Sequence, residues 1–236
     1  MITKPIKTRI FKEGESLNDF ISNYFKKIYE NSIIVITSKI VALSENRTAE
    51  KIDVTTKENL IKSESEIAIP TKYAWMTLKD GMIMASAGID ESNADGKLIL
   101  LPKNSFEAAR IIRKNLKTKF GVKNLGVLIT DSRTLPFRSG VIGAAMGYAG
   151  FRGIKDYTKK KDIFGRKFKF SRVNVADSLA TAAVFVMGEG DERQPLAIIK
   201  NADVEFCEKV RKGELNIDVT DDMYSPIISE LAKNKE

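Results

Sequence analysis

Short apolar segments, each bounded by polar residues, limit most strongly the folds open to this chain of 236 residues. The segments SIIVITSKIVA (32–42), LGVLITD (125–131) and PLAIIK (195–200) are rich in β-branched residues, which favours buried strands. No apolar run approaches the roughly 18 residues that a membrane-spanning helix needs. Hydrophobic residues make up 43% of the chain, enough for a true core. We therefore expect a globular protein made of one large domain or two small ones.

Two stretches have the three-and-four spacing of amphipathic helices. Residues 14–31 carry apolar side chains at this spacing behind Ser16, which is placed as an N-cap. Residues 104–121 place Ile111 on an apolar face and end at Gly121, a typical helix terminator. Both stretches are therefore predicted to pack one face against the core.

The second half of the chain predicts further elements. Residues 155–175 look like a β-hairpin with a Phe-Gly turn, and the small-residue segment 175–188 predicts a helix. Two more helices are expected to close the chain, the first of which contains Cys207. The glycine-rich segment 139–153 fits close packing, a phosphate loop or a subunit interface equally well.

The complete absence of histidine excludes more chemistry than any residue present. A Ser-His-Asp triad, a histidine base and the usual zinc site all need imidazole, and one cysteine cannot form a thiolate zinc site. A metal ion would have to be held by oxygen atoms, which favours Mg²⁺ or Mn²⁺. The formal charge of +8 attracts anions such as nucleotides, phosphorylated substrates or nucleic acid.

Acidic clusters follow three of the apolar segments. They are GIDESN with Asp90 and Asn93, ITDS with Asp131 and Ser132, and MGEGDE with Glu189 and Asp191. Each cluster alone is most simply an ordinary solvated turn. Together, at the ends of packed strands, they predict a shared cleft whose carboxylates hold a cation.

Basic residues near these clusters could bind the negative charge of a ligand. They are Lys39, Arg133 and Arg138, with Arg152 and Arg166 as further candidates. Arginine binds phosphate or carboxylate through a bidentate fork, so we assign Arg133 and Arg138 a catalytic role in meeting ligand charge. Two solvated surface arginines are the simpler alternative. The sequence GxxxxGK[ST] does not occur, which excludes an ordinary P-loop.

In their order and spacing, these motifs resemble the coenzyme F420-0:L-glutamate ligase family of GTP-dependent γ-glutamyl ligases. The matching segments run from about residue 7 to residue 201: VITSKIV, AGIDESN, VLITDS followed by PFR, GYAGFRGIKDY, NVADSLA and VMGEGDE. The segments GIDESN and TDS followed by PFR are the most specific of them.

The resemblance implies an α+β fold with mixed or antiparallel sheets and flanking helices, unrelated to P-loop proteins. It implies a single domain over residues 1–236, with two intertwined subdomains as the alternative, and a homodimer. The implied reaction joins L-glutamate to an acceptor carboxylate, F420-0 or a related compound, with GTP as co-substrate. Two Mg²⁺ or Mn²⁺ ions would assist it, and K⁺ is a further cofactor candidate.

The resemblance also assigns individual residues. Asp90 and Asp131 would hold the first cation, and Ser132 and Glu189 the second. The nucleotide would be bound by Ser38, Lys39, Asn93, Met187, Gly188, Gly190, Asp191 and Gln194.

The chain departs from the family pattern at three places. Leu43 stands where a lysine is usual, and Glu189 stands where glutamine is common. Residues 132–147 also differ, which leaves the acceptor open, so a ligase with a non-F420 acceptor on the same scaffold stays a close alternative. A non-catalytic protein that binds nucleotides or nucleic acid is a third hypothesis, although the sequence has no nucleic-acid-binding signature.

The first residues of the sequence are informative about subcellular localisation. The stretch MITKPIKTRI lacks the apolar core of a signal peptide. We therefore expect a cytoplasmic protein that does not bind membranes.

Overall fold

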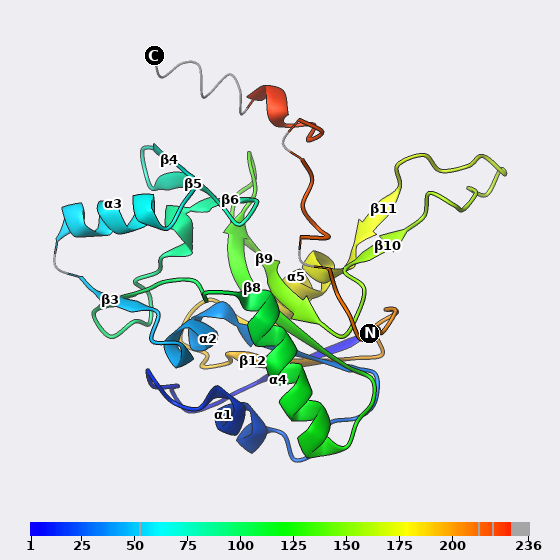
Figure 1. Ribbon diagram of the computed structural model, residues 1–236, viewed down its shortest axis with the longest axis horizontal. Helices are drawn as coiled ribbons and strands as arrows, with labels where there is room; N and C mark the ends of the chain where they lie inside the picture. The colour runs from blue at the N-terminus through cyan, green and yellow to red at the C-terminus, as the bar shows by residue number, and fades with distance from the viewer. Residues whose placement is uncertain (52, 212, 219, 228–236) are drawn as a thin grey trace.

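A five-stranded mixed sheet forms the centre of the molecule (Figure 1). The computed structural model describes residues 1–236 except residues 52, 212, 219 and 228–236. In spatial order the strands are β1 (Ile2–Ile6), β12 (Leu196–Lys200), β2 (Ser32–Thr37), β8 (Leu125–Thr134) and β9 (Val141–Ala149). The neighbours β2 and β8 run parallel, and the other neighbouring pairs are antiparallel.

Helices cover both faces of this sheet. The flanking helices are α1 (Leu17–Tyr24) and α4 (Ser105–Phe120) on one face and α5 (Val175–Met187) on the other, and α2 (Ser38–Ser44) continues directly from β2. Successive residues of β2 pack on opposite faces of the sheet. Ile34 and Ile36 lie in the core shared with α1 and α4, and Ile33 and Val35 lie in the core shared with α5. This explains the unbroken apolar run of β2, because a strand covered on both faces has no solvent side.

A smaller group of elements lies at one end of the sheet, at the upper left of Figure 1. It contains β3 (Thr48–Glu50), α3 (Val54–Ser63), β4 (Ile67–Pro70), β5 (Trp75–Lys79), β6 (Met82–Ala85), the 3-10 turn η1 (Ser86–Gly88) and β7 (Lys97–Ile99). The strands form a β3–β7 pair and a three-stranded β4–β5–β6 sheet. Buried Ile61 and Leu98 belong to a small core of this group's own.

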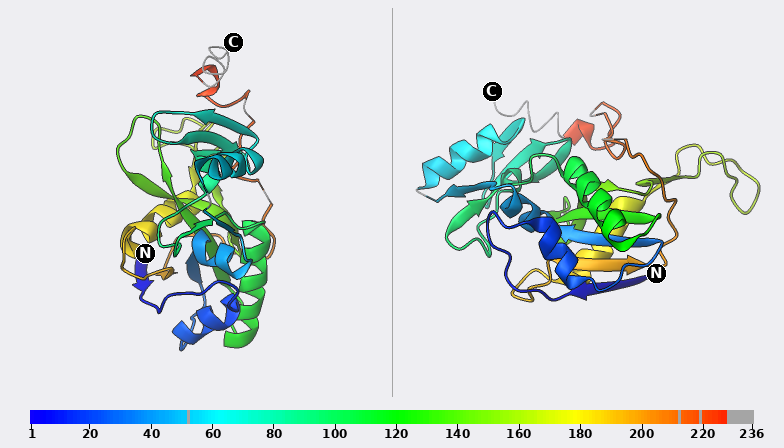
Figure 2. Two further views of the ribbon diagram at one scale, coloured as in Figure 1. Left: turned by 90° about the vertical axis from the view of Figure 1, so that its left-hand side faces the viewer. Right: turned by 60° about the horizontal axis from the view of Figure 1, so that its bottom comes forward.

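A β-hairpin projects from the opposite end of the molecule (Figure 2). Its base is formed by β10 (Ile154–Asp156) and β11 (Arg172–Asn174), which pair antiparallel. The hairpin expected over residues 155–175 is therefore confirmed.

Both predicted amphipathic helices are present, with two errors. The first helix, α1, ends at Tyr24 and does not reach Ile28, and the buried face of α4 differs from the predicted one. Ser16 caps α1 by accepting a hydrogen bond from the Asp19 backbone N–H, and Asn104 caps α4 in the same way. Gly121 ends α4 with a left-handed φ of 65°. Ile111, however, is 43% exposed, because the core side of α4 runs through Ala109, Ile112, Arg113 and Leu116.

Two strand ends differ from expectation. The run 32–42 is not one strand, because β2 stops at Thr37 and Ser38 begins α2. Strand β8 does not end at Asp131 but continues to Thr134, because its last residues pair with β9.

The predicted helix around Cys207 is wrong. Residues 201–211 form an irregular segment in which Phe206 makes an isolated bridge to Phe151. The segment is held instead by ion pairs to α4, since Glu208 accepts hydrogen bonds from Arg113 and Lys117. The second predicted closing helix falls partly on residues 228–236, outside the described residues.

The fold is thus α+β with several sheets, as expected, and it is not a P-loop fold. In the part of the chain that the structure describes, no helix combines the length and apolar character needed to cross a membrane. The single-domain assignment for residues 1–236 stays a prediction.

Candidate active site

A cavity of about 1070 Å³ lies where the central sheet meets the smaller group of elements. Much of its wall comes from four parts of the chain: residues 7–11, the junction of β2 and α2, the loop at 88–95, and the loop at 187–195. Residues 130–134 of β8 and residues 99–101 line it as well. All three acidic clusters therefore contribute to one pocket, as the sequence predicted.

The parallel strands β2 and β8 set the floor of this pocket. Their carboxyl ends are in register, with Thr37 opposite Thr130, so the next residues of both strands reach the same edge. Ser38 Oγ donates a hydrogen bond to Asp131 Oδ1 at 2.9 Å. The carboxyl edge of parallel strands is the usual place for ligands in such sheets.

A β-bulge lies directly before Asp131. The register of β8 with β9 shifts between Ile129 and Thr130, so that Met146 is the extra residue on β9. Bulges turn side chains and are frequent beside active sites. This one separates the buried part of β8 from the part that lines the pocket.

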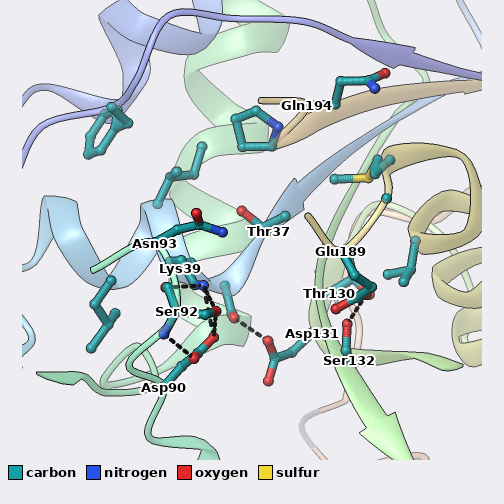
Figure 3. Close-up of a pocket in the computed structure, with 18 of the residues that line it drawn as sticks. Thr37, Lys39, Asp90, Ser92, Asn93, Thr130, Asp131, Ser132, Glu189 and Gln194 are labelled. Atoms are coloured by element: carbon teal, nitrogen blue, oxygen red, sulfur yellow. Dashed lines mark hydrogen bonds and ion pairs between the residues drawn. The ribbon is translucent and has the colours of Figure 1, made fainter. Parts of the chain in front are cut away.

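The loop after η1 presents Asp90 to Lys39 (Figure 3). Lys39 Nζ lies 2.8 Å from Asp90 Oδ2 and also donates to Ser92 O at 2.7 Å. Burial alone would raise the pKa of Asp90, but hydrogen bonds from Lys39 and Ser92 outweigh it and leave that pKa below its ordinary value. Glu91 points elsewhere and pairs with Lys51 and Lys57.

The loop after α5 closes the opposite wall. Glu189 accepts a hydrogen bond from Ser132 Oγ, and the Gly190 N–H donates to Glu192 Oε2 at 2.8 Å. Asn93 Nδ2 donates to the Gly190 carbonyl at 3.3 Å and so links two acidic loops across the cavity. Figure 3 shows Ser132 and Glu189 facing one another beside Asp131.

The four arginines singled out in the sequence separate in space. Arg133 lines the pocket, and its Nη1 donates to the Asp131 carboxylate. Arg138 lies in the exposed turn between β8 and β9, outside the lining residues. Arg152 is 3.6 Å from Glu205, and Arg166 lies in the projecting hairpin, so neither contributes to this pocket.

The other predicted site residues all line the cavity. They are Ser38, Lys39, Asp90, Asn93, Asp131, Ser132, Met187, Gly188, Glu189, Gly190, Asp191 and Gln194. Leu43, which stands in the place of a family lysine, lines it too. Their gathering in one pocket is an observation, while their individual roles stay predictions.

Some lining residues were missed by sequence reasoning. Ser92 and Asp95 belong to the same turn as Asp90 and Asn93, so the turn itself was the available signal. Arg9 lies in the N-terminal segment, which reaches the pocket because the Thr8 N–H donates to the Arg193 carbonyl at 2.8 Å. No local pattern announces that contact, because it joins segments far apart in the sequence.

Oxygen atoms dominate the polar lining of the pocket. Among the described residues, no three His, Cys, Asp or Glu side chains gather into a group that could hold a metal ion by themselves. Three of the carboxylates, those of Asp90, Asp131 and Glu189, each lie beside a hydroxyl or a basic group. Mg²⁺ is commonly held in such a way, by one or two carboxylates together with substrate phosphates and water.

Comparison with known proteins gives consistent relatives. Coenzyme F420:L-glutamate ligase of Methanococcus maripaludis strain C6 is 36% identical over 218 residues, 85% of this chain and 87% of the relative. The protein of the same name from Methanocaldococcus jannaschii is 34% identical over 84% of this chain and 86% of the relative. Residues 5–201 match the family model described as F420-0:Gamma-glutamyl ligase. The match covers most of the chain, including every element that lines the pocket, and the chain therefore belongs to the F420-0:gamma-glutamyl ligase family.

Proposed function

We propose that the protein is a GTP- and divalent-cation-dependent ligase that forms a γ-glutamyl-type amide bond between L-glutamate and an acceptor carboxylate, F420-0 or a related compound. The observation that carries this proposal is the meeting of three acidic clusters with Ser38 and Lys39 in one pocket of a chain of this family. The relatives' names supply the glutamate and the F420 acceptor.

The size of the cavity supports a reaction with several substrates. Its volume of about 1070 Å³ is at the upper end of ordinary small-molecule pockets, which run from ~300 to ~1,000 Å³. A ligase must hold a nucleotide, an acceptor and an amine at the same time.

The donor atoms fit hard cations. Asp90 and Asp131 would hold one Mg²⁺ or Mn²⁺ ion, and Ser132 and Glu189 the other, with K⁺ as a further candidate at the same oxygen-rich wall. Such ions, when bound, would neutralise phosphate charge. Ser132 and Glu189 are already in contact, and Asp131 meets Ser38 at the same strand edge.

The proposed reaction balances without a histidine base. The acceptor carboxylate attacks the γ-phosphorus of GTP, the bond to the β-phosphate oxygen breaks, and GDP leaves. The glutamate amine then attacks the acyl phosphate carbon, loses a proton, and displaces phosphate. Lys39 and Arg133 would offset the charge of these groups, and the pocket would supply their positioning.

A direct test is calorimetric titration of GDP and of ADP into the full chain, with Mn²⁺ or with EDTA. We expect Mn²⁺-dependent binding of GDP in preference to ADP, followed by glutamate-dependent release of phosphate when F420-0 and GTP are supplied. The Asp131→Asn variant should keep its fold and lose both. Asp203→Asn removes a carboxylate that is 93% exposed and does not line the pocket, and it should change neither.

Other outcomes separate the alternatives. Binding of GDP without turnover of F420-0 would favour a different acceptor, which residues 133–141 would select because several of them line the pocket. Absence of nucleotide binding in wild type would overturn the ligase proposal and leave a binding protein.

A homodimer is part of the proposal. The side chains of Ile163, Phe164 and Phe170 on the projecting hairpin are 92%, 90% and 88% exposed. Phe185 on the outer face of α5 is 86% exposed, on a helix that is apolar nearly all round. We take these side chains as the surface that a second copy would cover. We further expect cytoplasmic localisation.

A further inference from the structure

Arg133 occupies an unusual position in the pocket wall. Its side chain is only 10% exposed, although it borders a cavity of about 1070 Å³. Nη1 donates to the Asp131 carboxylate and to the Ser132 carbonyl at 2.9 Å. Nη2 donates to the sulfur of Met146, the bulge residue of β9, at 3.2 Å.

These contacts leave the guanidinium poorly satisfied. Its Nε is buried and has no hydrogen-bond partner among the described residues. A thioether is a weak acceptor, so the Nε–Nη2 edge, the edge that normally grips a carboxylate or phosphate, meets only Met146. A buried charge held in this way stabilises the fold little, because its desolvation offsets the attraction. Stability alone therefore does not explain why Arg133 is placed there.

Both carboxylate oxygens of Asp131, the partner of Arg133, accept a hydrogen bond. Asp131 Oδ1 accepts from Ser38 Oγ at 2.9 Å, and Oδ2 accepts from Arg133. Each oxygen keeps a free lone pair, so a cation at Asp131 would have Ser38 and Arg133 as neighbours. Ser38 is neutral and remains compatible with a bound cation, whereas a guanidinium in contact with the same carboxylate repels one.

We propose that Arg133 is a built-in counter-ion of Asp131, which holds this carboxylate while no divalent cation is bound and is displaced when one binds. The displaced guanidinium then meets the anionic group of the ligand in the same pocket. Cation and anionic ligand would thus bind with positive coupling, because each relieves a cost that the other faces. The inference rests on the proposed role of Asp131 as a cation ligand.

The second ion pair of the pocket is different. Lys39 is bonded to Asp90 but also to Ser92 O and Ser92 Oγ, at 2.7 and 3.0 Å. If Asp90 takes up a cation, Lys39 keeps two oxygen partners. If Asp131 takes one up, Arg133 keeps one, the Ser132 carbonyl, beside the weakly accepting sulfur of Met146. The counter-ion role is specific to Arg133, a residue at one of the positions where this chain departs from the family pattern.

The test is Mn²⁺ affinity of the full chain without nucleotide, measured by electron paramagnetic resonance of free Mn²⁺. The Arg133→Met variant, which fills the space next to Met146 without charge, should bind Mn²⁺ about tenfold more tightly than wild type. Arg110→Met removes an equal charge from a 63% exposed position on α4 and should stay within about twofold, because solvent screens it.

Coupling is the second readout. In wild type, GDP should increase Mn²⁺ affinity strongly, and in Arg133→Met this increase should be several times smaller, because no counter-ion remains to be displaced. Arg133→Lys keeps the charge but not the fork, so its Mn²⁺ affinity without GDP should lie between those of wild type and Arg133→Met. If Arg133→Met fails to fold, as judged by circular dichroism, Arg133→Lys decides the question.

Two failures are distinguishable. If wild type binds no Mn²⁺ with or without GDP, the proposed function itself fails. If wild type binds Mn²⁺ with GDP while Arg133→Met shows unchanged or weaker affinity without GDP, only the counter-ion role is overturned.

Discussion

Glu208 shows how a single exposed carboxylate can fasten a segment that has no regular structure. It accepts hydrogen bonds from Arg113 Nη1 and Nη2 and from Lys117 Nζ, all at 2.9 Å. These bonds lower the pKa of Glu208 to about 2. Arg113 itself is buried and also donates to the Leu125 carbonyl, so the carboxylate joins the C-terminal segment to α4 and β8.

The pH dependence of this contact has a definite sign. Because the pKa of Glu208 is lower in the folded chain, its contribution to stability is present above its ordinary pKa of 4.5 and is lost as the pH falls toward 2. We expect Glu208→Gln to lower the urea midpoint at pH 7, and the difference from wild type to shrink below pH 4.5. The effect should be about 1 kcal/mol or less, because the side chain is 69% exposed.

A suitable comparison is Glu205→Gln on the same segment, whose carboxylate is 75% exposed and 3.6 Å from Arg152. It should change the midpoint less at every pH. A difference between Glu208→Gln and wild type that grows on acidification would contradict the assignment.

At the scale of elements, β9 is where the glycine-rich segment obtains its structure. Gly143 lies so close to α5 that a Cβ atom there would come within 2.3 Å of the Ala180 carbonyl oxygen. The Thr181 hydroxyl donates to the Gly143 carbonyl at 2.8 Å. Gly147 is equally tight against the start of α4, where its Cβ would meet the Ser105 carbonyl carbon at 2.4 Å. Of the three roles that the sequence left open for this segment, these two glycines therefore have that of close packing.

Gly143→Ala should destabilise the protein by about 1–3 kcal/mol, because β9 and α5 must move apart to admit one methyl group. Chemical unfolding with urea measures this loss. Gly190→Ala is the matched control, since a Cβ there meets nothing nearer than 3.5 Å. Equal stabilities of the two variants would show that β9 and α5 can move apart at little cost in free energy, and would contradict the prediction.

At the scale of the whole molecule, charge and apolar surface are concentrated on the projecting hairpin. Residues 155–172 contain eight Lys and Arg and two Asp, a net charge of +6 out of the +8 of the chain. The rest of the chain therefore carries a net charge of only +2. The same hairpin carries three of the most exposed apolar side chains of the described structure.

We expect the wild-type protein to elute as a dimer in size-exclusion chromatography with light scattering. Replacing Phe164 and Phe170 together with Ser should shift it toward monomer without lowering the stability of the body, because both side chains are nearly fully exposed. Val54→Ser, at a 74% exposed site on α3, is the control and should leave the dimer intact. A wild-type monomer that binds RNA with a steep salt dependence would instead favour the nucleic-acid interpretation of the charge.

The sequence by itself determined the elements whose signals are local. Spacing and capping residues located α1 and α4, small residues located α5, and β-branched runs located β2 and β12. The absence of histidine, with a single cysteine, restricted metal ligands to oxygen atoms, and the absence of GxxxxGK[ST] excluded an ordinary P-loop. The polar residues at the ends of apolar segments identified most of the pocket, because strand ends necessarily open onto a sheet edge.

Only the tertiary structure decided what depends on partners distant in sequence. Strand β8 runs past Asp131 because β9 pairs with it, and Arg133 meets Asp131 while Arg138 lies outside the pocket because of the geometry of that pairing. The segment around Cys207 is not helical because Glu208 finds its partners on α4, more than ninety residues away in the sequence. Local pattern carries no information on such pairings, since their free energy arises from contacts that exist only once the sheet and its helices have assembled.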